Sequence, residues 1–374
     1  MEIHLVGGAV RDALLGRPVT DRDYLVLHAT QEAFQARYPT ARLVGKSFPV
    51  FILEGSEYAW PRGGCLENDL LLRDLTINAM AKDSRGEIHA HPLALNDIEN
   101  KVLRPCSPSS MQDDPVRIFR AARFVAQFPD FSASDELLEQ MRQVAQAGFL
   151  GDQAAERVGR EVVKALGAPN PSRFLELLRM TGCLSPWFEE VAACVGAPAG
   201  PAPYHDNVFQ HTLKVMDRLA LSRKDVPDPL LVWMGLTHDL GKGAASYGHD
   251  KAGAVSARTL GMRLRLPAVF IEAGAMAASE RRRVHRYAEM RPGSRVDLLM
   301  RLEAKRLTTR MFKLAAADIG ANLLPLARRD LRVIRAVTLP ADKRDMGEAS
   351  GEILRQLRCE AVAALMRRPD DETS

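Results

Sequence analysis

Two acidic residues near the N-terminus, Asp21 and Asp23, have side chains that can bind a hard metal ion. Successive side chains of a β-strand point to opposite faces, so two carboxylates at positions i and i+2 emerge on the same face. Carboxylate oxygens are ligands that Mg²⁺ prefers, usually together with the phosphates of a substrate. If these residues lie in a strand, the pair predicts a Mg²⁺ site for nucleotidyl transfer.

A phosphate-binding turn is predicted just before this acidic pair, at Gly7 and Gly8. Glycine allows backbone N–H groups to approach a phosphate closely, and a helix that follows directs its positive end to the same place. Arg11, on that helix, adds a planar guanidinium that can bind two phosphate oxygens. The turn, the arginine and the acidic pair together predict a site for a nucleoside triphosphate.

A third set of side chains, Asp114, Arg117 and Arg120, is spaced for one face of a helix that Pro115 would begin. The pairing edges of cytosine and adenine offer an amino donor beside a ring-nitrogen acceptor, which an aspartate and an arginine can satisfy. Guanine and uracil reverse that order and would leave unpaired contacts that cost about 1–3 kcal/mol each. The set therefore predicts selection of C and A without a template, with an ordinary intrahelical salt bridge as the alternative.

The motifs, in this order, resemble the signature of the class II tRNA nucleotidyltransferases, which are the CCA-adding enzymes and their bacterial poly(A) polymerase relatives. Leu72–Ala81 resembles the family motif whose arginine, here Arg73, holds the incoming nucleotide; a capping network around Asp74 is the alternative, and Leu72 replaces a family arginine. The resemblance implies that Asp21 and Asp23 are catalytic and hold Mg²⁺ while the tRNA 3′-hydroxyl attacks the α-phosphate of CTP or ATP. The nucleotide-binding residues that we expect are Gly8, Arg11, Arg73, Asp114, Arg117 and Arg120.

The sequence departs from the family at a loop. Family members that complete CCA have a flexible loop before the Arg-Asp motif, but here Tyr58–Arg62 is followed only by Gly-Gly-Cys before Leu66–Leu70. In this family, loss of the loop is associated with addition of CC without the terminal A. Four interpretations stay open: CCA addition, CC addition, poly(A) polymerase activity, and a degenerate RNA-binding head. A third catalytic carboxylate is not identified, and the candidates are Glu57, Glu67 and Asp69.

A second set of chemical groups, His211, the pair His238–Asp239, and Asp318, has imidazoles and carboxylates suited to a divalent transition metal. The segment Leu236–Lys242 resembles the HD phosphohydrolase motif of the multifunctional bacterial CCA-adding enzymes. The resemblance implies a metal site on these four residues, with His249 as an additional ligand. Arginines stand in Ser279–Arg286 where the family has a further histidine, which predicts a mononuclear or weakened site. A solvated helix face is the expected place for these arginines, and contact with phosphate is the alternative.

The bulk composition is that of a globular protein with room for a large core. The chain has 374 residues, 46% hydrophobic and 26% charged, and a net charge of +4, which is compatible with nucleic acid. Five scattered cysteines without a C-x-x-C pair are typical of reduced thiols, and the N-terminus lacks the pattern of a signal peptide. We expect a cytoplasmic protein with tRNA, ATP and CTP as partners and no membrane.

The elements that must position these residues are an α+β head followed by an all-α remainder. Short apolar runs predict strands at Ile3–Val6, Tyr24–Leu27 and Val50–Leu53, and apolar residues at helical spacing predict helices at Asp114–Gln127, Ser134–Ala147, Ala154–Leu166 and Ser172–Met180. The stretch Val195–Pro203 is rich in Gly and Pro and predicts a linker. The expected domains are a small mixed-sheet nucleotidyltransferase head (1–105), a helical neck and body (106–195), an HD domain (204–322) and a helical tail (323–374).

Overall fold

A computed structural model describes residues 1–45, 49–198, 207–221, 226–244 and 249–367. The chain divides into two compact units. The first comprises Met1–Ala165 with Arg173–Pro186, and the second comprises Leu166–Ser172 with Trp187–Ser374. The first unit contains the sheet and the second is helical, so the α+β class with a mixed-sheet head and a mostly helical remainder is confirmed.

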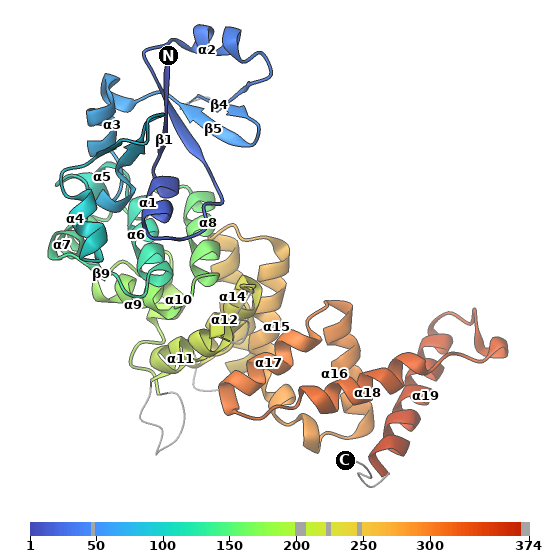
Figure 1. The fold of residues 1–374 in the computed structure, drawn as a ribbon. Helices are drawn as coiled ribbons and strands as arrows, with labels where there is room; N and C mark the ends of the chain where they lie inside the picture. The colour runs from blue at the N-terminus through green and yellow to red at the C-terminus, as the bar shows by residue number, and fades with distance from the viewer. Residues whose placement is uncertain (46–48, 199–206, 222–225, 245–248, 368–374) are drawn as a thin grey trace. The chain divides into compact units, whose positions relative to one another are not determined.

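The first unit is built on a seven-stranded mixed sheet with the order β3-β4-β5-β2-β1-β6-β7 (Figure 1). Strands β2 and β5 run parallel, whereas the other neighbours in this sheet are antiparallel. The strands are β1 (Glu2–Val6), β2 (Asp23–Leu27), β3 (Arg42–Val44), β4 (Val50–Leu53), β5 (Ser56–Ala59), β6 (Met80–Lys82) and β7 (Ile88–Ala90).

Apolar side chains on both faces of this sheet are buried because the strand alternation directs them into two clusters. Val6 and Leu25 pack on one face with Leu66, while Val26 packs on the other face with Phe34. The elements that cover or extend the sheet are α1 (Gly8–Leu14), α2 (Gln31–Arg37), η1 (Arg62–Gly64), α3 (Leu66–Leu71), η2 (Thr76–Asn78) and α4 (Ala94–Glu99). The clusters fix the central strands, which in turn position the acidic residues at the start of β2.

Helices follow the sheet in the first unit. They are α5 (Ser110–Asp113), α6 (Val116–Gln127), α7 (Asp135–Gln146), α8 (Ala155–Leu166) and α9 (Ser172–Met180), and β8 (Val102–Leu103) pairs with β9 (Ser132–Ala133). Helix α6 is buried along most of its length, including Ile118, Phe119 and Phe124. The predicted helices match α6 to α9 within two residues, because their apolar spacing is helical.

The second unit is organised around α12, which is apolar on every side and is therefore enclosed by other helices. Residues Leu231–Thr237 are all buried, and the indole N–H of Trp233 donates to the carbonyl of Phe270 over 2.7 Å. Helices α11, α15 and α17 contact α12. The elements of this part of the second unit are α10 (Glu189–Ala192), α11 (Val208–Leu221), α12 (Pro229–Thr237), α13 (Gly241–Ala244), α14 (His249–Arg263), α15 (Ala268–His285), η3 (Tyr287–Glu289) and α17 (Thr308–Ile319).

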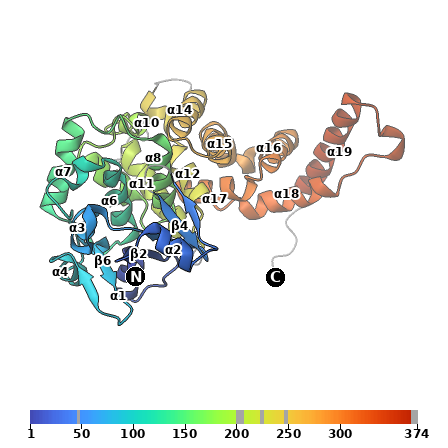
Figure 2. The same ribbon diagram turned by 90° about the horizontal axis from the view of Figure 1, so that it is seen from above.

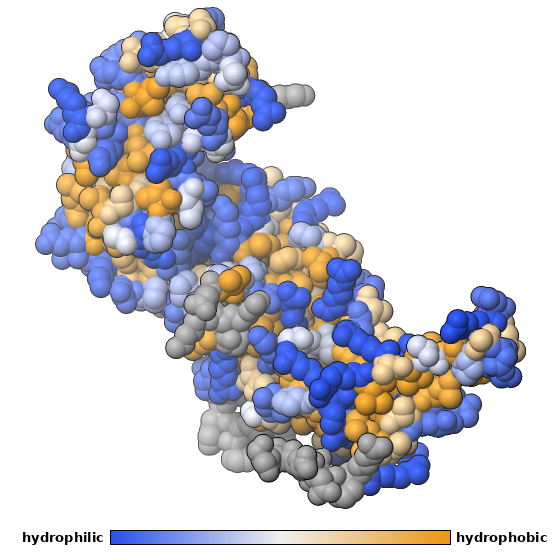
Figure 3. All heavy atoms as spheres, turned by 45° about the vertical axis from the view of Figure 1, so that its right-hand side comes forward, coloured by the Kyte–Doolittle hydropathy of each residue, from blue (hydrophilic) through white to orange (hydrophobic). Residues whose placement is uncertain are grey.

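The end of the second unit consists of α16 (Pro292–Ala304), α18 (Leu324–Ala336), η4 (Ala341–Lys343) and α19 (Glu348–Arg367). Helix α19 packs against α16 and α18 (Figure 2). A groove of about 510 Å³ is lined by residues of α16, α18 and α19, including Arg295, Arg332 and Leu365. The visible face of the molecule carries patches of apolar side chains bordered by hydrophilic ones (Figure 3).

Three remaining expectations concern the linker, the cysteines and membrane spans. The predicted linker Val195–Pro203 lies outside the described residues from 199 onward. All five cysteines lie in the described part of the chain and are free. Within the described ranges, every helix is too short or too polar to cross a bilayer.

Candidate functional site

The predicted acidic pair lies at the start of β2. Asp23 is the first residue of this strand and Asp21 precedes it, so the strand that we expected to carry both carboxylates holds only the second. Both residues are exposed. Surrounding atoms still desolvate the carboxylate of Asp23, which raises its pKa; the charge of Asp21 acts in the same direction, and Arg73 opposes both. The first unit thus brings two carboxylates and a guanidinium within electrostatic range of one another.

A third carboxylate, that of Glu57, is placed beside Asp23 by the register of the sheet. In the parallel pair β2–β5, Asp23 and Glu57 are direct partners, and directly paired residues point to the same face. The other two candidates lie in α3 and not in the sheet: Asp69 is 2% exposed and forms ion pairs with Arg62 and Arg73, and Glu67 is an exposed residue of the first turn. The sequence could not distinguish these three, because strand pairing is a long-range property.

The predicted phosphate-binding turn connects β1 to α1, and Arg73 lies directly over it. Gly7 has φ +68°, which favours glycine, and a Cβ there would lie 2.9 Å from Nη1 of Arg73. Arg73 donates from Nε to Asp69 (3.0 Å) and from Nη1 to the carbonyl of Asn78 (3.3 Å). A side chain at position 7 would therefore displace the arginine, so this glycine is required both by backbone conformation and by close approach.

Arg11 is placed differently from our expectation. Its side chain is buried, donates to Asp12 and Asn78, and lies 5.1 Å and 5.0 Å from the ring centroids of Phe124 and Phe128. Burial is also the main cause that lowers its pKa. The guanidinium of Arg11 is therefore not free to bind phosphate at the turn. It connects α1 to Asn78 of η2 and to the aromatic side chains Phe124 and Phe128. The surrounding aromatic residues come from distant sequence, so the motif alone did not reveal this.

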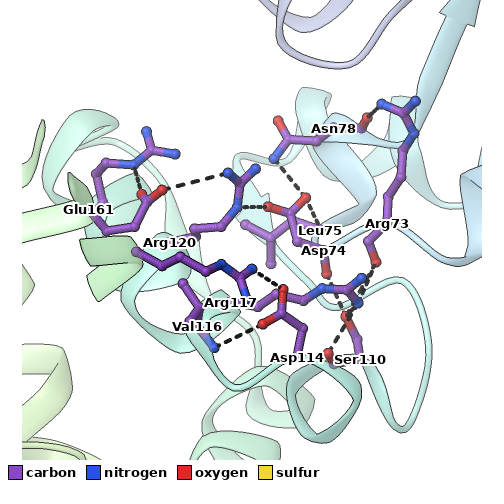
Figure 4. Close-up of polar contacts among 12 residues, drawn as sticks. Arg73, Asp74, Leu75, Asn78, Ser110, Asp114, Val116, Arg117, Arg120 and Glu161 are labelled. Atoms are coloured by element: carbon purple, nitrogen blue, oxygen red, sulfur yellow. Dashed lines mark hydrogen bonds and ion pairs between the residues drawn. The ribbon is translucent and has the colours of Figure 1, made fainter. Parts of the chain in front are cut away.

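A buried ion pair connects the Arg-Asp motif to α6 (Figure 4). The carboxylate of Asp74 accepts hydrogen bonds from Arg120 Nε (2.8 Å), Asn78 Nδ2 (3.1 Å) and the backbone N–H of Leu75 (2.9 Å). Burial disfavours the charged carboxylate, but Arg120 and these hydrogen bonds hold the pKa of Asp74 well below its usual range. Arg120 also lies 3.7 Å from Glu161 of α8. The capping network considered as an alternative is therefore present, and it extends to the predicted nucleotide-binding residue Arg120.

The predicted base-selecting pair does not share a helix face. Asp114 has an extended backbone before Pro115, because a residue that precedes proline is disfavoured in the helical region, and α6 begins only at Val116. Its carboxylate accepts a hydrogen bond from Arg157 of α8 over 2.6 Å. Arg117 instead donates to the backbone carbonyls of Arg73 (3.3 Å) and Ser110 (3.1 Å) (Figure 4). It also donates to the carbonyl of Leu72 over 2.7 Å.

The connection from β5 to α3, where the family has its flexible loop, is a single tight turn. It contains the 3-10 helix η1, with positive φ at Gly63 and Gly64. Arg62 donates from Nε to Asp69 over 2.8 Å, and Asn68 donates to the carbonyl of Gly63 over 2.9 Å. Both contacts hold the turn against α3, so the shortened sequence forms a compact connection next to Asp69, which also binds Arg73.

A candidate metal centre lies in the second unit, where the four predicted residues come together. The carboxylate of Asp318 lies 2.8 Å from His211 Nε2 and 3.8 Å from His238 Nε2. Asp239 Oδ2 lies 3.6 Å from His238 Nε2 and 4.0 Å from His211 Nε2. Among the described residues, His211, His238 and Asp239 form a group whose ligand atoms lie close enough to hold one metal ion. Helices α11, α12 and α17 supply or flank these residues.

His238 is buried and oriented in the way that a metal ligand requires. It is 2% exposed, and its Nδ1 lies 2.7 Å from the carbonyl of Gly235, which requires the proton on Nδ1. Nε2 then lies toward Asp239 and Asp318, and within the described part of the chain it has no hydrogen-bond partner although it is buried. Burial lowers the pKa of this imidazole. A buried ring nitrogen without a hydrogen-bond partner among the described residues, on an imidazole oriented by a backbone carbonyl, fits a metal ion.

Two further groups join this cluster, and one was not expected there. His285 Nε2 lies 3.0 Å from Asp318 Oδ2, and Arg281 Nη1 lies 2.5 Å from Asp239 Oδ1. The expectation that the arginines of this segment form a solvated face is wrong for Arg281, which is 9% exposed. The additional ligand that we predicted, His249, has its Nδ1 3.4 Å from the carbonyl of Gly241 and is not part of the group above.

The comparisons with known proteins agree with the motifs. Residues 130–195 match the family described as "Probable RNA and SrmB- binding site of polymerase A". A protein of Nitrosococcus oceani named "Multifunctional CCA protein" is 38% identical over 97% of this chain and 98% of its own length. A protein of Pseudomonas aeruginosa with the same name is 35% identical over 97% of this chain and 98% of its own length.

Solved structures share the fold. A CCA-adding enzyme complexed with ATP superposes with a TM-score of 0.68 at 19% identity, covering 99% of this chain and 89% of that one. The Thermotoga maritima CCA-adding enzyme complexed with tRNA has a TM-score of 0.61 at 19% identity, covering 97% of this chain and 91% of that one. At this identity, the structures show a common architecture along nearly the whole chain.

Proposed function

Because this chain belongs to the class II family of CCA-adding enzymes, we propose that it extends the 3′ end of tRNA with C and A residues from CTP and ATP, without a nucleic-acid template. The observation that carries this is the near-complete coverage of the "Multifunctional CCA protein" relatives, together with Asp23, Glu57 and Arg73 around one turn. Structures of relatives with a primer tRNA, ATP and CTP support these partners.

Divalent-metal dependence follows from the family, and we propose Mg²⁺ held by Asp21 and Asp23. Bound there, the ion would neutralise the triphosphate and lower the pKa of the attacking 3′-hydroxyl. We propose Glu57 as the third carboxylate, because it is the partner of Asp23 in the sheet. Asp23, with its raised pKa, lies in surroundings that favour neutralisation of its charge, which a cation supplies as well as a proton does.

The nucleotide lies, in this proposal, over the turn that Gly7 and Gly8 form, with Arg73 on its phosphates. Positioning and charge neutralisation then carry most of the catalysis. We propose Arg11 as a positioning residue, since its donors are directed to Asp12 and Asn78. Asn78 in turn presents the carbonyl that accepts from Arg73, so Arg11 supports the segment that orients the phosphate-binding guanidinium.

Base selection is assigned to Asp114 and Arg117, with Arg120 holding the motif in place through Asp74. Both selecting side chains have protein partners without nucleotide, which are Arg157 for Asp114 and backbone carbonyls for Arg117. An incoming cytosine or adenine has to replace these contacts with its own amino donor and ring nitrogen. Asp114 and Arg117 therefore have hydrogen-bond partners both without nucleotide and with cytosine or adenine bound, so neither charge is left unpaired when the correct base binds.

A second candidate product, CC without the terminal A, is favoured by one observation, which is the compact β5–α3 turn. The test is to incubate the purified full chain with a tRNA that lacks its 3′ end and with labelled CTP, ATP or both. Addition of C and then A establishes CCA addition, and C alone establishes CC addition. Long A tracts would establish a poly(A) polymerase, and no addition in a folded, Mg²⁺-supplied chain would overturn the proposal in favour of a degenerate head.

For the second unit we propose a metal-dependent phosphohydrolase centre on His211, His238, Asp239 and Asp318. The specific observation is the buried, partnerless Nε2 of His238 among two carboxylates and further imidazoles. A transition metal bound there would polarise a phosphate ester and generate a nucleophile from water. Hydrolysis of a phosphodiester such as bis(p-nitrophenyl) phosphate by the chain, lost on His238→Ala, tests this centre separately from nucleotide addition.

The proposed domains keep the predicted boundaries: a head (1–105), a neck and body (106–195), an HD domain (204–322) and a tail (323–374). The nucleotidyl-transfer residues would then lie in the head and at the start of the neck, and the candidate metal centre in the HD domain. Limited proteolysis with mass spectrometry checks these boundaries, because cleavage concentrates in exposed connections between folded parts.

A further inference from the structure

Arg281 extends a buried side chain into the candidate metal centre from α15, a helix that packs against α12, α14 and α17. It comes from α15 and is 9% exposed, with Nη1 2.5 Å from Asp239 Oδ1 and 3.7 Å from Asp318 Oδ2. The next residue, Arg282, has a side chain that is 56% exposed and lies 3.3 Å from Asp250. Two adjacent arginines on one helix therefore have opposite environments, and only the first contacts the carboxylates of the centre.

The two oxygens of Asp239 face different cationic positions. Oδ2 faces the histidines, 3.6 Å from His238 Nε2 and 4.0 Å from His211 Nε2, and Lys242 Nζ lies 2.8 Å from the same oxygen. Oδ1 faces Arg281. A carboxylate shared in this way, with one oxygen for each of two cations, is the arrangement by which a two-metal site bridges its ions about 3.5–4 Å apart. Here a guanidinium stands in the second position.

The charges in the centre are already balanced without two ions. The carboxylates of Asp239 and Asp318 face the cations of Arg281 and Lys242, so one divalent ion bound beside His238 already gives an excess of positive charge. A second ion would have to displace the guanidinium from Oδ1 or lie beside it, and like charges at such distances repel strongly in a buried pocket.

We propose that Arg281 is a resident cation that replaces the second metal ion of the centre and limits it to one divalent ion, bound through His211, His238, Asp239 and Asp318. The guanidinium leaves its planar donors beside the ion, where they suit a phosphate oxygen. This inference rests on the phosphohydrolase centre proposed above and adds to it the number of ions and the group that takes the place of the missing one.

The test counts Mn²⁺ ions in the full chain by equilibrium dialysis and electron paramagnetic resonance. All proteins carry Asp23→Asn, so that the nucleotidyl-transfer site does not add to the count. Arg281→His supplies a neutral imidazole where the guanidinium stands, and Arg282→His is the matched control one residue further along the same helix. We expect about one Mn²⁺ ion per chain in the protein that carries only Asp23→Asn and in the Arg282→His control. In Arg281→His we expect about two ions per chain and the spectrum of two exchange-coupled ions.

A second variant keeps the test decisive if the histidine variant does not fold. Arg281→Met retains the bulk of the side chain but removes the charge and adds no metal ligand, so we expect one ion bound roughly tenfold more tightly. Two ions in the chain with Arg281 present, one ion in a folded Arg281→His, or weaker binding in Arg281→Met would each overturn the inference and leave the hydrolase proposal standing. If the chain bound no ion whose binding is lost on His238→Ala, both the inference and the hydrolase proposal would be overturned.

Discussion

Asp74 is the residue whose ionisation most directly ties the head of the molecule to α6. Its buried carboxylate accepts from Arg120, Asn78 and a backbone N–H. Because its pKa is lowered in the folded chain, its contribution to stability is complete above the unfolded pKa of about 3.9. That contribution is lost as the pH falls through this value toward the lower, folded pKa.

Asp74→Asn should therefore lower the free energy of unfolding of the first unit by about 2 kcal/mol at pH 7 and flatten its loss of stability below about pH 4. Urea unfolding followed at several pH values measures both effects. Asp130→Asn is the control, because Asp130 forms an exposed pair with Lys101 that contributes about 0–1 kcal/mol. An unchanged acid limb in Asp74→Asn would contradict the assigned role of this carboxylate.

Asp114 bears on base choice. Asp114→Ala removes the acceptor for the amino group of cytosine or adenine, so incorporation of UTP and GTP should rise relative to CTP and ATP by about tenfold or more, which corresponds to about 1.4 kcal/mol. Single-nucleotide incorporation with each of the four triphosphates measures the ratio. Asp113→Ala is the neighbouring control, since its carboxylate accepts from Ser109. An equal loss for all four nucleotides would indicate that Asp114 only supports the structure through Arg157.

Single residues show where prediction from sequence ends. The types and spacing of Asp21, Asp23 and His238 predict chemistry directly, because the ligands lie in short motifs. Arg11, Glu57 and Arg281 could not be assigned in this way, because their positions depend on partners from distant segments. An arginine in a sequence pattern indicates a charge, and only the fold determines whether that charge faces solvent, an aromatic cluster or a carboxylate.

At the scale of elements, periodicity located the strands and helices well, since burial imposes a period of about 2 or 3.6 residues on apolar side chains. Predicted strands at Tyr24–Leu27 and Val50–Leu53 correspond to β2 and β4. The ends of helices and the pairing of strands were harder to predict from the sequence. Pro115 moves Asp114 off α6, and the parallel pairing of β2 with β5 depends on contacts that no local pattern contains.

The packing of α12 against α15 depends on a glycine. A Cβ at Gly274 would lie 2.6 Å from the indole nitrogen of Trp233, which is fully buried. Gly274→Ala should therefore destabilise the second unit by about 1–3 kcal/mol, because the helices cannot approach as closely. Thermal unfolding measures this loss.

The control for this substitution is Gly351→Ala in α19, where nothing lies within 4 Å of the new Cβ. Alanine is favoured over glycine inside a helix by about 1 kcal/mol, so this control should be neutral or stabilising. Equal melting temperatures for the two alanine variants would show that the close approach of α12 and α15 relaxes without cost.

At the scale of the whole molecule, the two candidate sites belong to different compact units. The residues from Asp21 to Glu161 that surround the nucleotidyl-transfer site lie in the first unit, and His211, His238, Asp239 and Asp318 lie in the second. Each site draws its side chains from elements of its own unit, so the ligands of one are held independently of the ligands of the other.

This separation predicts that the activities can be removed one at a time. Asp21→Ala should lower nucleotide addition to tRNA by at least about 10³-fold, since a metal-bound carboxylate acts on the reacting phosphates, and should leave phosphodiester hydrolysis unchanged. His238→Ala should abolish hydrolysis and leave addition unchanged, because its imidazole lies wholly within the second unit. Both assays are run on each variant after its melting temperature has been matched to the unsubstituted chain. If either substitution removed both activities from a folded chain, the sites would have to share a residue or a conformational step, and the assignment of one site to each unit would fail.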